Sequence, residues 1–424
     1  MSAHPLPFAF EKRVGCEGKV LALTNVWEIK RGIGPLKNGR GLRTGKGKSM
    51  RIAMLGQKVV PSRRGGIELV LTTMCPMMVK RGHSVTCMNR SGDAVENEYV
   101  NMVHDHRYEG VKLEKVATIH KKGLSAMTAS FSAALHAAFG KYDVVHFHAE
   151  GPCAALWIPK LFGIRCVVTI HGLDWAREKW KSGFGSKYIK FGEKTAAKYA
   201  DEIIVLSKGV QQYFQDTYHR PTTIIPNGVS RPQKRKARLI TEQFGLHENE
   251  YICALSRLTE EKGIHYLIEA YQKLHTDKKL VIAGDTSDTD DYVKRLKEMA
   301  AGNENIIFTG FVSGELLDEL YSNAYVYVLP SNLEGMPLSL LEAMSYGNAV
   351  IGSDIPEIAD VVEDKALLFQ KSNAADLQEK LQLLCDHPEQ VAKYKREAAD
   401  FICRKYNWDD VVDETLKLYQ TTAS

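Results

Sequence analysis

Several features that would assign this 424-residue chain to a class at once are missing from it. No apolar run reaches the roughly 18 residues that a membrane-spanning helix needs, and the opening residues lack the apolar core of a secretory signal. The eight cysteines are scattered, with no CxxC pair and no Cys/His cluster at zinc spacing. We therefore expect a cytoplasmic protein with reduced thiols and no bound metal.

The dinucleotide fingerprint GxGxxG is also absent, which argues against a nicotinamide-dependent enzyme. The net charge of +5 does not indicate a nucleic-acid partner, because residues 1–49 hold ten lysines and arginines against three glutamates. They carry +7, and the rest of the chain therefore carries about −2. Residues 1–49 are interpreted as a basic, disordered extension. It is either an arm that attracts a membrane or partner or, as we prefer, a stretch outside the functional protein.

The residues that are present indicate two globular domains. Hydrophobic residues make up 44% and charged residues 25% of the chain, and 424 residues exceed one ordinary core. From Met50 onward, short β-branched runs alternate with amphipathic stretches. The expected strands are Arg51–Gly56, Ser84–Asn89, Asp143–His148, Cys166–Ile170 and Glu202–Leu206 in the first half, and Tyr251–Ser256, Leu280–Gly284, Ile306–Thr309, Tyr325–Leu329 and Ala349–Gly352 in the second.

Most of these runs do not alternate between apolar and polar residues, which is typical of parallel strands buried on both faces. The sequence thus predicts an α/β protein with two Rossmann-like, doubly wound domains facing across a cleft. A turn near Asn227-Gly228 and a polar, basic stretch after it separate the domains. We predict an N-terminal domain over residues 50–229, a C-terminal domain over 230–405 and a final helix within 406–424.

Two glutamates eight residues apart form the strongest motif, in Glu334-Gly335-Met336-Pro337-Leu338-Ser339-Leu340-Leu341-Glu342. Pro337 suits a helix start, so Glu334 is expected on the preceding loop and Glu342 inside the helix. A carboxylate accepts two hydroxyl hydrogen bonds and so suits the vicinal diols of ribose or hexose rings. On spacing alone, a capping acid and a solvated helix glutamate would be the better explanation, but the neighbouring motifs favour a binding role.

Cations follow the first expected strand of the second domain. Arg257 supplies a planar guanidinium and Lys262 a mobile ammonium, a combination that suits a diphosphate leaving group. In the first domain, Gly65 and Gly66 precede an expected helix, where the backbone can approach a phosphate. His171 follows a strand and precedes a glycine, which favours a cleft position over a core position.

Together these motifs resemble the family 4 retaining glycosyltransferases of the GT-B fold, from Met50 to the C-terminus. The matching segments are Gly65-Gly66-Ile67-Glu68, Arg81-Gly82-His83-Ser84-Val85, the Arg257/Lys262 pair, Phe308-Thr309-Gly310-Phe311-Val312 and the two-glutamate motif. The resemblance implies transfer of a hexose or deoxyhexose from a nucleoside diphosphate sugar to a glycan or lipid-linked acceptor, with no cofactor and no metal.

The resemblance also implies roles for individual residues. Arg257 and Lys262 would bind the donor diphosphate, Glu342 the ribose, and Glu334 with its neighbours Gly335 and Met336 the donor hexose. Gly65 and Gly66 would approach phosphates or acceptor, Phe311 and Val312 would line the base pocket, and His171 would lie beside the anomeric carbon. The final helix would cross back onto the first domain.

A finer likeness starts at His171-Gly172-Leu173-Asp174-Trp175 and continues to Lys179-Trp180. It resembles a bacterial subgroup that transfers rhamnose during capsule or cell-wall polysaccharide assembly. Aromatic residues among lysines and arginines from Trp175 to Lys187 predict either a peripheral contact with the inner face of a membrane or an ordinary amphipathic helix.

Two metal-like patterns are interpreted otherwise. Asp288-Thr289-Asp290 spells a DxD motif but lies in an acidic run typical of a solvated loop. His146 and His148 share one face of a strand without an evident third ligand, which favours a structural or acceptor-side role. Two alternative functions remain open, a nucleotide-sugar epimerase and a non-catalytic nucleotide-binding partner. The first would need no acceptor and the second would not turn over donor.

Overall fold

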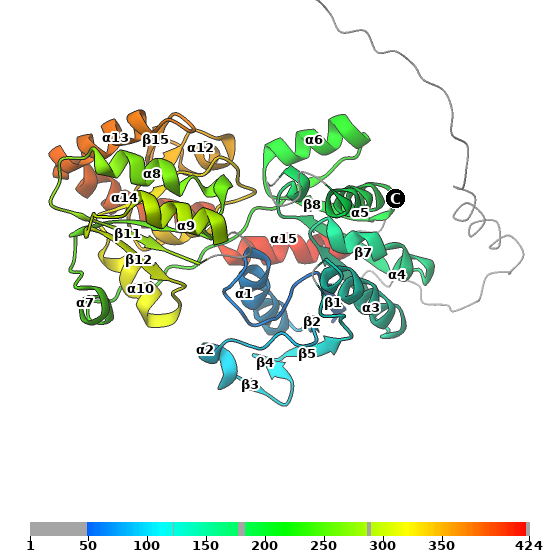
Figure 1. Cartoon of the computed structure of the whole chain (residues 1–424). Helices are drawn as coiled ribbons and strands as arrows, with labels where there is room; N and C mark the ends of the chain where they lie inside the picture. Colours follow the sequence, from blue (N-terminus) through cyan, green and yellow to red (C-terminus); the bar gives the residue numbers. More distant parts are fainter. Residues whose placement is uncertain (1–48, 122, 177–182, 286–289, 421–424) are drawn as a thin grey trace, which may run out of the picture. The chain divides into compact units, whose positions relative to one another are not determined.

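The computed structural model describes residues 49–121, 123–176, 183–285 and 290–420. Within them, two separate sheets, the first mainly and the second entirely parallel, organise the chain (Figure 1). No helix in these ranges is both long and apolar enough to cross a membrane.

The first sheet has the strand order β3-β4-β5-β2-β1-β6-β7-β8-β9 in the described residues. All neighbours pair in parallel except β3 with β4 and β4 with β5. The strands are β1 (Arg51–Leu55), β2 (Ser84–Arg90), β3 (Val103–His104), β4 (Arg107–Tyr108), β5 (Val111–Val116), β6 (Val144–His148), β7 (Arg165–Ile170), β8 (Glu202–Val205) and β9 (Thr223–Ile224). The helices between them are α1 (Gly66–Lys80), α2 (Asn97–Val100), α3 (Ser125–Phe139), α4 (Trp157–Leu161), α5 (Phe184–Tyr199) and α6 (Lys208–Tyr218).

The second sheet is parallel throughout, with the order β12-β11-β10-β13-β14-β15. Its strands are β10 (Tyr251–Leu255), β11 (Lys279–Ala283), β12 (Ile306–Gly310), β13 (Val326–Leu329), β14 (Ala349–Ser353) and β15 (Leu367–Phe369). Its helices are α7 (Leu239–Phe244), α8 (Ile264–Gln272), α9 (Asp290–Met299), α10 (Gly314–Asn323), α11 (Leu338–Ser345), α12 (Pro356–Val362), α13 (Ala374–Asp386) and α14 (Pro388–Lys405).

Both sheets place their first strand in the middle and extend outward on either side of it, which is the doubly wound order. Alternate residues of β1 enter different cores: Ala53 and Leu55 pack with α3, α4 and α5, whereas Ile52 and Met54 pack with α1. Burial on both faces explains why the strands read as unbroken apolar runs. The predicted pair of Rossmann-like domains is confirmed.

The last helix, α15 (Trp408–Gln420), packs on the first sheet although it follows the second in sequence. Its buried residues Val412 and Leu416 share a core with α1, and Figure 1 shows the two helices side by side. Arg81 at the end of α1 bonds Asp409 and Asp413 at 2.7 and 2.6 Å. This helix ties the end of the chain to its first Rossmann unit.

Two segments connect the sheets, and they touch each other. The backbone N–H of Val229 donates to the carbonyl of Tyr406 at 2.7 Å. Gly228 lies so close to Trp408 that an added Cβ would sit 2.5 Å from the indole ring. The predicted domain boundary at residue 229 falls inside this paired crossing.

Candidate functional site

A small recess brings together the cations and one glutamate of the predicted site. Arg257 follows β10, Lys262 ends a 3₁₀ turn over Glu260–Lys262, and Glu334 lies on the loop between β13 and α11. Lys262 Nζ donates to Glu334 Oε1 at 2.6 Å, with the side chains only 16% and 7% exposed. The residues that line this recess are Gly172, Leu173, Arg257, Glu261, Lys262, Leu333, Glu334 and Gly335.

The first sheet contributes the other wall of the recess through the segment after β7. A Cβ added to Gly335 would lie 1.8 Å from the carbonyl oxygen of His171, so only glycine permits this approach. The Glu334 loop and the His171 loop are therefore in direct contact. Both follow the carboxyl ends of parallel strands, which is where ligands of doubly wound sheets bind.

Glu342 is not among the residues that line the recess. From α11 it forms an ion pair with Arg63, which lies in the loop after β1, and it accepts a hydrogen bond from Tyr321 Oη at 3.3 Å. Burial is the largest single influence on Arg63 and lowers the pKa of its guanidinium, but Glu342, helped by Tyr99, Tyr321 and Glu98, raises that pKa overall. Sequence reasoning gave Arg63 no role, although its place just before the Gly65-Gly66 turn was a usable signal.

The glycine turn lies at the start of α1, with Gly65 as the N-cap residue. A carboxylate oxygen of Glu68 occupies the space beside Gly65, 2.1 Å from where a Cβ would be, and Glu68 also accepts from the N–H of Lys58 at 2.7 Å. A phosphate approaching Gly65 would therefore meet this carboxylate. Gly66 is exposed, and a Cβ there would lie 3.5 Å from Leu338.

The residues predicted to line a base pocket differ in exposure. Phe311 follows β12, is 41% exposed, and lies 5.2 Å from the Arg64 guanidinium by its ring centroid. Val312 is buried in the core of the second sheet, so its side chain is not open to a ligand. Met336 faces the crossing between the sheets, where its sulfur accepts from the N–H of Asn227 at 3.0 Å.

Three histidines form a continuous chain behind the recess. His171 Nε2 and His148 Nδ1 are 3.0 Å apart, and the rings of His148 and His146 stack at 4.2 Å between centroids. His146 in turn bonds Tyr419 Oη at 2.6 Å and Thr169 Oγ1 at 2.8 Å. Burial lowers the pKa of His146 to about 3 and that of His148 well below its usual value, so both rings are neutral. The contact between His148 and His171 was not predicted.

Family comparisons match both halves of the chain to known domains. Residues 64–231 match the family described as Glycosyltransferase Family 4, and residues 237–401 match Glycosyl transferases group 1. The chain joins a family 4 glycosyltransferase domain to a group 1 glycosyltransferase domain.

Individual relatives are similar to these two domains over most of their length. An uncharacterized glycosyltransferase of Methanocaldococcus jannaschii, MJ1607, is 26% identical over an alignment of 400 positions. This alignment covers 88% of this chain and 98% of the relative. Alpha-maltose-1-phosphate synthase of Mycolicibacterium smegmatis is 25% identical over 66% of this chain and 79% of its own.

Solved structures share the fold of the two glycosyltransferase domains. Sucrose-phosphate synthase from Thermosynechococcus elongatus has a TM-score of 0.74 at 20% identity, covering 88% of this chain and 98% of its own. HepE of Anabaena, solved with UDP and glucose, has a TM-score of 0.71 at 18% identity, with 87% and 98% covered.

Some predicted features lie outside the described residues. Asp288 and Thr289 of the DxD pattern do so, as do Arg177, Lys179, Trp180 and Lys181 of the aromatic and basic stretch. Across the described ranges, no group of three or more His, Cys, Asp and Glu side chains is arranged to hold a metal ion. Trp175 is described, and its indole N–H donates to Glu193 at 2.9 Å.

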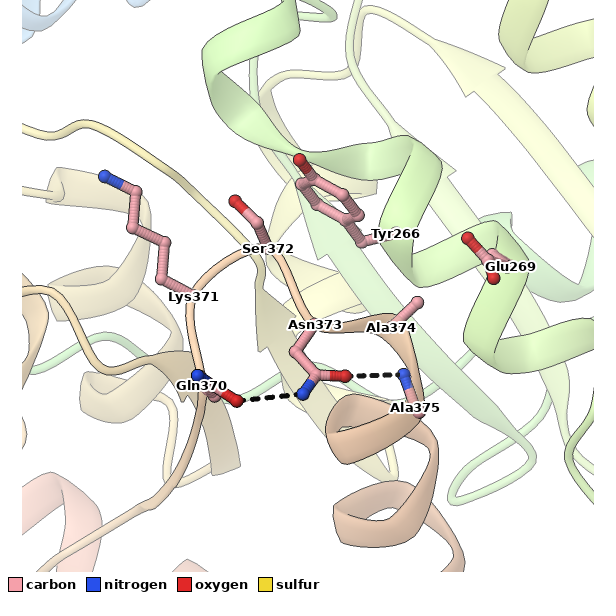
Figure 2. Close-up of a pocket in the computed structure, with 8 residues that line it drawn as sticks. All are labelled: Tyr266, Glu269, Gln370, Lys371, Ser372, Asn373, Ala374 and Ala375. Atoms are coloured by element: carbon pink, nitrogen blue, oxygen red, sulfur yellow. Dashed lines mark hydrogen bonds between the residues drawn. The ribbon is translucent and has the colours of Figure 1, made fainter. Parts of the chain in front are cut away.

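A wider pocket, of about 470 Å³, lies elsewhere in the group 1 domain, between α8 and the start of α13 (Figure 2). None of its lining residues belongs to the predicted site. The Asn373 side chain accepts a hydrogen bond from the N–H of Ala375 at the start of α13 and donates one to the Gln370 side chain, as the dashed lines in Figure 2 show. Lys371 is the one cation that lines this pocket, whereas the recess holds two, so the recess suits a diphosphate better.

Proposed function

We propose that this protein is a retaining, metal-independent glycosyltransferase that uses a nucleoside diphosphate sugar. The observation that carries the proposal is the Lys262–Glu334 ion pair, nearly buried beside Arg257 and against the His171 loop. The recess thus combines two cations, Arg257 and Lys262, with the carboxylate of Glu334, which is proposed to bind sugar hydroxyls. These are the groups needed to hold a diphosphate next to a sugar.

In the proposed reaction, the bond from the anomeric carbon to the phosphate oxygen breaks as negative charge grows on the leaving diphosphate. Arg257 and Lys262 stabilise that charge by charge-assisted hydrogen bonds. The acceptor hydroxyl attacks from the same face, and its proton passes to the leaving phosphate oxygen. Glu334 is engaged with Lys262 and is proposed to accept hydroxyl hydrogen bonds from the hexose rather than to act as a nucleophile.

The remaining predicted roles belong to the same proposal. Glu342 would bind the ribose, and its pairing with Arg63 supports this by holding the carboxylate in place. Phe311, beside Arg64, would stack on the base. His171 would lie at the anomeric carbon, with His148 holding its ring.

The proposed donor and acceptor rest on the similarity of this chain to other glycosyltransferases. HepE was solved with UDP and glucose, which makes UDP-sugars the first donors to test. The His171–Trp175 stretch resembles the rhamnose-transferring subgroup, so nucleotide-activated rhamnose is a second donor to test. The proposed acceptor is a glycan or a lipid-linked acceptor of surface polysaccharide synthesis at the inner face of a membrane. A donor at 100 times its dissociation constant stabilises the fold by about 2.7 kcal/mol, so a thermal-shift screen of nucleotide sugars identifies it.

Transfer by purified protein then tests the recess. Arg257→Ala and Lys262→Ala should each raise the activation free energy of transfer by about 3 kcal/mol, as the loss of a transition-state donor does. The transfer rate should therefore fall roughly 100-fold. Lys273→Ala is the matched control, because this exposed lysine of the same domain pairs with Glu269 on the surface. Unchanged turnover in both recess variants would reject the assignment.

Two further readouts separate the rival interpretations. Excess EDTA should leave the transfer rate unchanged, and a loss restored by a divalent cation would reject metal independence. Product should form only with acceptor present and with the anomeric configuration kept. Product from donor alone would indicate an epimerase, and donor binding without any turnover would indicate a non-catalytic partner.

A further inference from the structure

An unusual surface lies on the family 4 domain, on helices α3, α4 and α5. In the described residues, six phenylalanine and tryptophan side chains are exposed. Four of them belong to these helices, Phe139, Trp157, Phe184 and Phe191, and a fifth, Phe162, directly follows α4. Two of them, Phe139 and Phe184, are 70% and 71% exposed. Such a concentration of exposed aromatic surface marks an interaction site rather than scattered residues.

These side chains come from one layer of the fold. α3 packs on α4, α4 packs on α5, and all three cover the same side of the first sheet (Figure 1). The rings of Phe139 and Phe162 meet edge to face, with centroids 5.1 Å apart, although both remain more than half exposed. The Phe139 and Phe162 rings therefore form a patch across the boundary between α3 and α4, and the packing of α4 on α5 places the exposed rings of α5 in the same layer.

Helix α5 repeats aromatic and basic residues along its outward stripe. Phe184, Lys187, Phe191, Lys194 and Lys198 follow one another at intervals of three or four residues, and all are exposed. Such spacing places them on one face of a helix. The opposite face is buried in the core of the domain.

The charge of this surface has a single sign. Glu193 is the one acidic residue within α3, α4 and α5, and it is buried, where it accepts hydrogen bonds from Trp175, Tyr213 and Tyr218. The outward charges of α5 are lysines. A partner for this surface must therefore be anionic and must also accommodate aromatic rings.

We propose that this α3–α5 face, formed by the five aromatic residues and the lysines of α5, docks on an anionic lipid bilayer. Aromatic rings partition to the headgroup region, and lysines beside them bind anionic headgroups. A second copy of the chain is a poorer occupant, because a symmetric contact would set lysines against lysines. The proposal does not depend on catalysis, but the face belongs to the domain that contributes His171 to the recess.

Vesicle flotation with the full chain tests the docking. The protein should float with vesicles of phosphatidylcholine containing 30% phosphatidylglycerol and stay behind with pure phosphatidylcholine. Lys187→Glu with Lys194→Glu should lower the bound fraction at least tenfold, and Phe139→Ser with Phe162→Ser should lower it similarly. All four residues are exposed, so unfolding curves should match those of the unchanged protein.

A matched control separates the face from other basic parts of the chain, including residues 1–48. Lys273→Glu with Lys294→Glu changes the net charge equally on exposed lysines of the other domain and should leave binding unchanged. Quenching of tryptophan fluorescence by brominated lipid should fall in Trp157→Phe. No binding to anionic vesicles, an equal loss in the control, or a dimer that Phe139→Ser with Phe162→Ser dissociates would overturn the proposal.

Discussion

Two histidines buried in the first sheet predict a loss of stability in mild acid. His146 and His148 are each 1% exposed on β6, and burial lowers the pKa of His146 to about 3 and that of His148 well below its usual value. In the unfolded chain both regain an ordinary histidine pKa near 6.5. Below that pH the unfolded state binds more protons than the folded state, so stability falls as the pH falls.

The size of the effect follows from these pKa values. At pH 5, protonation stabilises an unfolded histidine by roughly 2 kcal/mol, and a folded histidine with a pKa of about 3 gains almost nothing. His146 alone therefore accounts for a loss of about 2 kcal/mol between pH 8 and pH 5, and the lowered pKa of His148 increases the loss further. That is a large part of the roughly 5–15 kcal/mol that stabilises a typical protein.

Urea unfolding at pH 8 and pH 5 measures this loss. The His146→Gln variant should lose about 2 kcal/mol less than the unchanged protein between the two pH values, since one buried titrating group is gone. His275→Gln, which removes an exposed histidine, should behave like the unchanged protein. The carboxylates titrate alike in all three proteins and cancel. An identical pH dependence for His146→Gln and the unchanged protein would refute the reasoning.

Three further predictions concern contacts between distant segments. Gly335→Ala places a Cβ 1.8 Å from the His171 carbonyl oxygen. It should lower the transfer rate at least tenfold in the glycosyl-transfer assay, which corresponds to a rise of about 1.4 kcal/mol in activation free energy. A double-mutant cycle on Arg63 and Glu342 should give a coupling of roughly 1–2 kcal/mol in urea unfolding, because the pair is partly buried. Trp408→Ala should cost about 3–5 kcal/mol of unfolding free energy, because this nearly buried indole anchors the last helix.

The Gly335 and Trp408 predictions each have a control in the same chain. Gly209→Ala meets only ordinary contacts at 3.5 Å and should leave transfer unchanged. Glu414→Ala, on the exposed side of the last helix, should change the free energy of unfolding by less than about 0.5 kcal/mol. Additive effects in the Arg63/Glu342 cycle, or a Trp408 variant as stable as the Glu414 variant, would contradict the contacts described.

The sequence was informative about the strands at the centre of each sheet. Ten strands were expected, and each was found within two residues of its predicted bounds, as with β11 at Lys279–Ala283. Central parallel strands are buried on both faces, so an unbroken apolar run marks them locally. The strand β5, which lies between β2 and the short strand β4, was missed, because three of its six residues, Val-Lys-Leu-Glu-Lys-Val, are charged and no unbroken apolar run marks it.

For the site, the sequence determined the types of residue and their places at strand ends. Arg257, Lys262, Glu334 and Glu342 were predicted as a set suited to a diphosphate and to sugar hydroxyls. Their partners could not be predicted. The two glutamates lie eight positions apart, yet Glu334 pairs with Lys262 and Glu342 with Arg63, which is 279 positions away.

Only the tertiary structure decided these partners, for a physical reason. Helix periodicity, turn chemistry and apolar runs depend on neighbours in sequence, whereas an ion pair depends on which loops the sheets bring together. The same holds for the contact of His148 with His171 and for the aromatic patch of α3, α4 and α5. The sequence by itself determined two Rossmann units and their chemical groups, and packing between distant segments decided which groups meet.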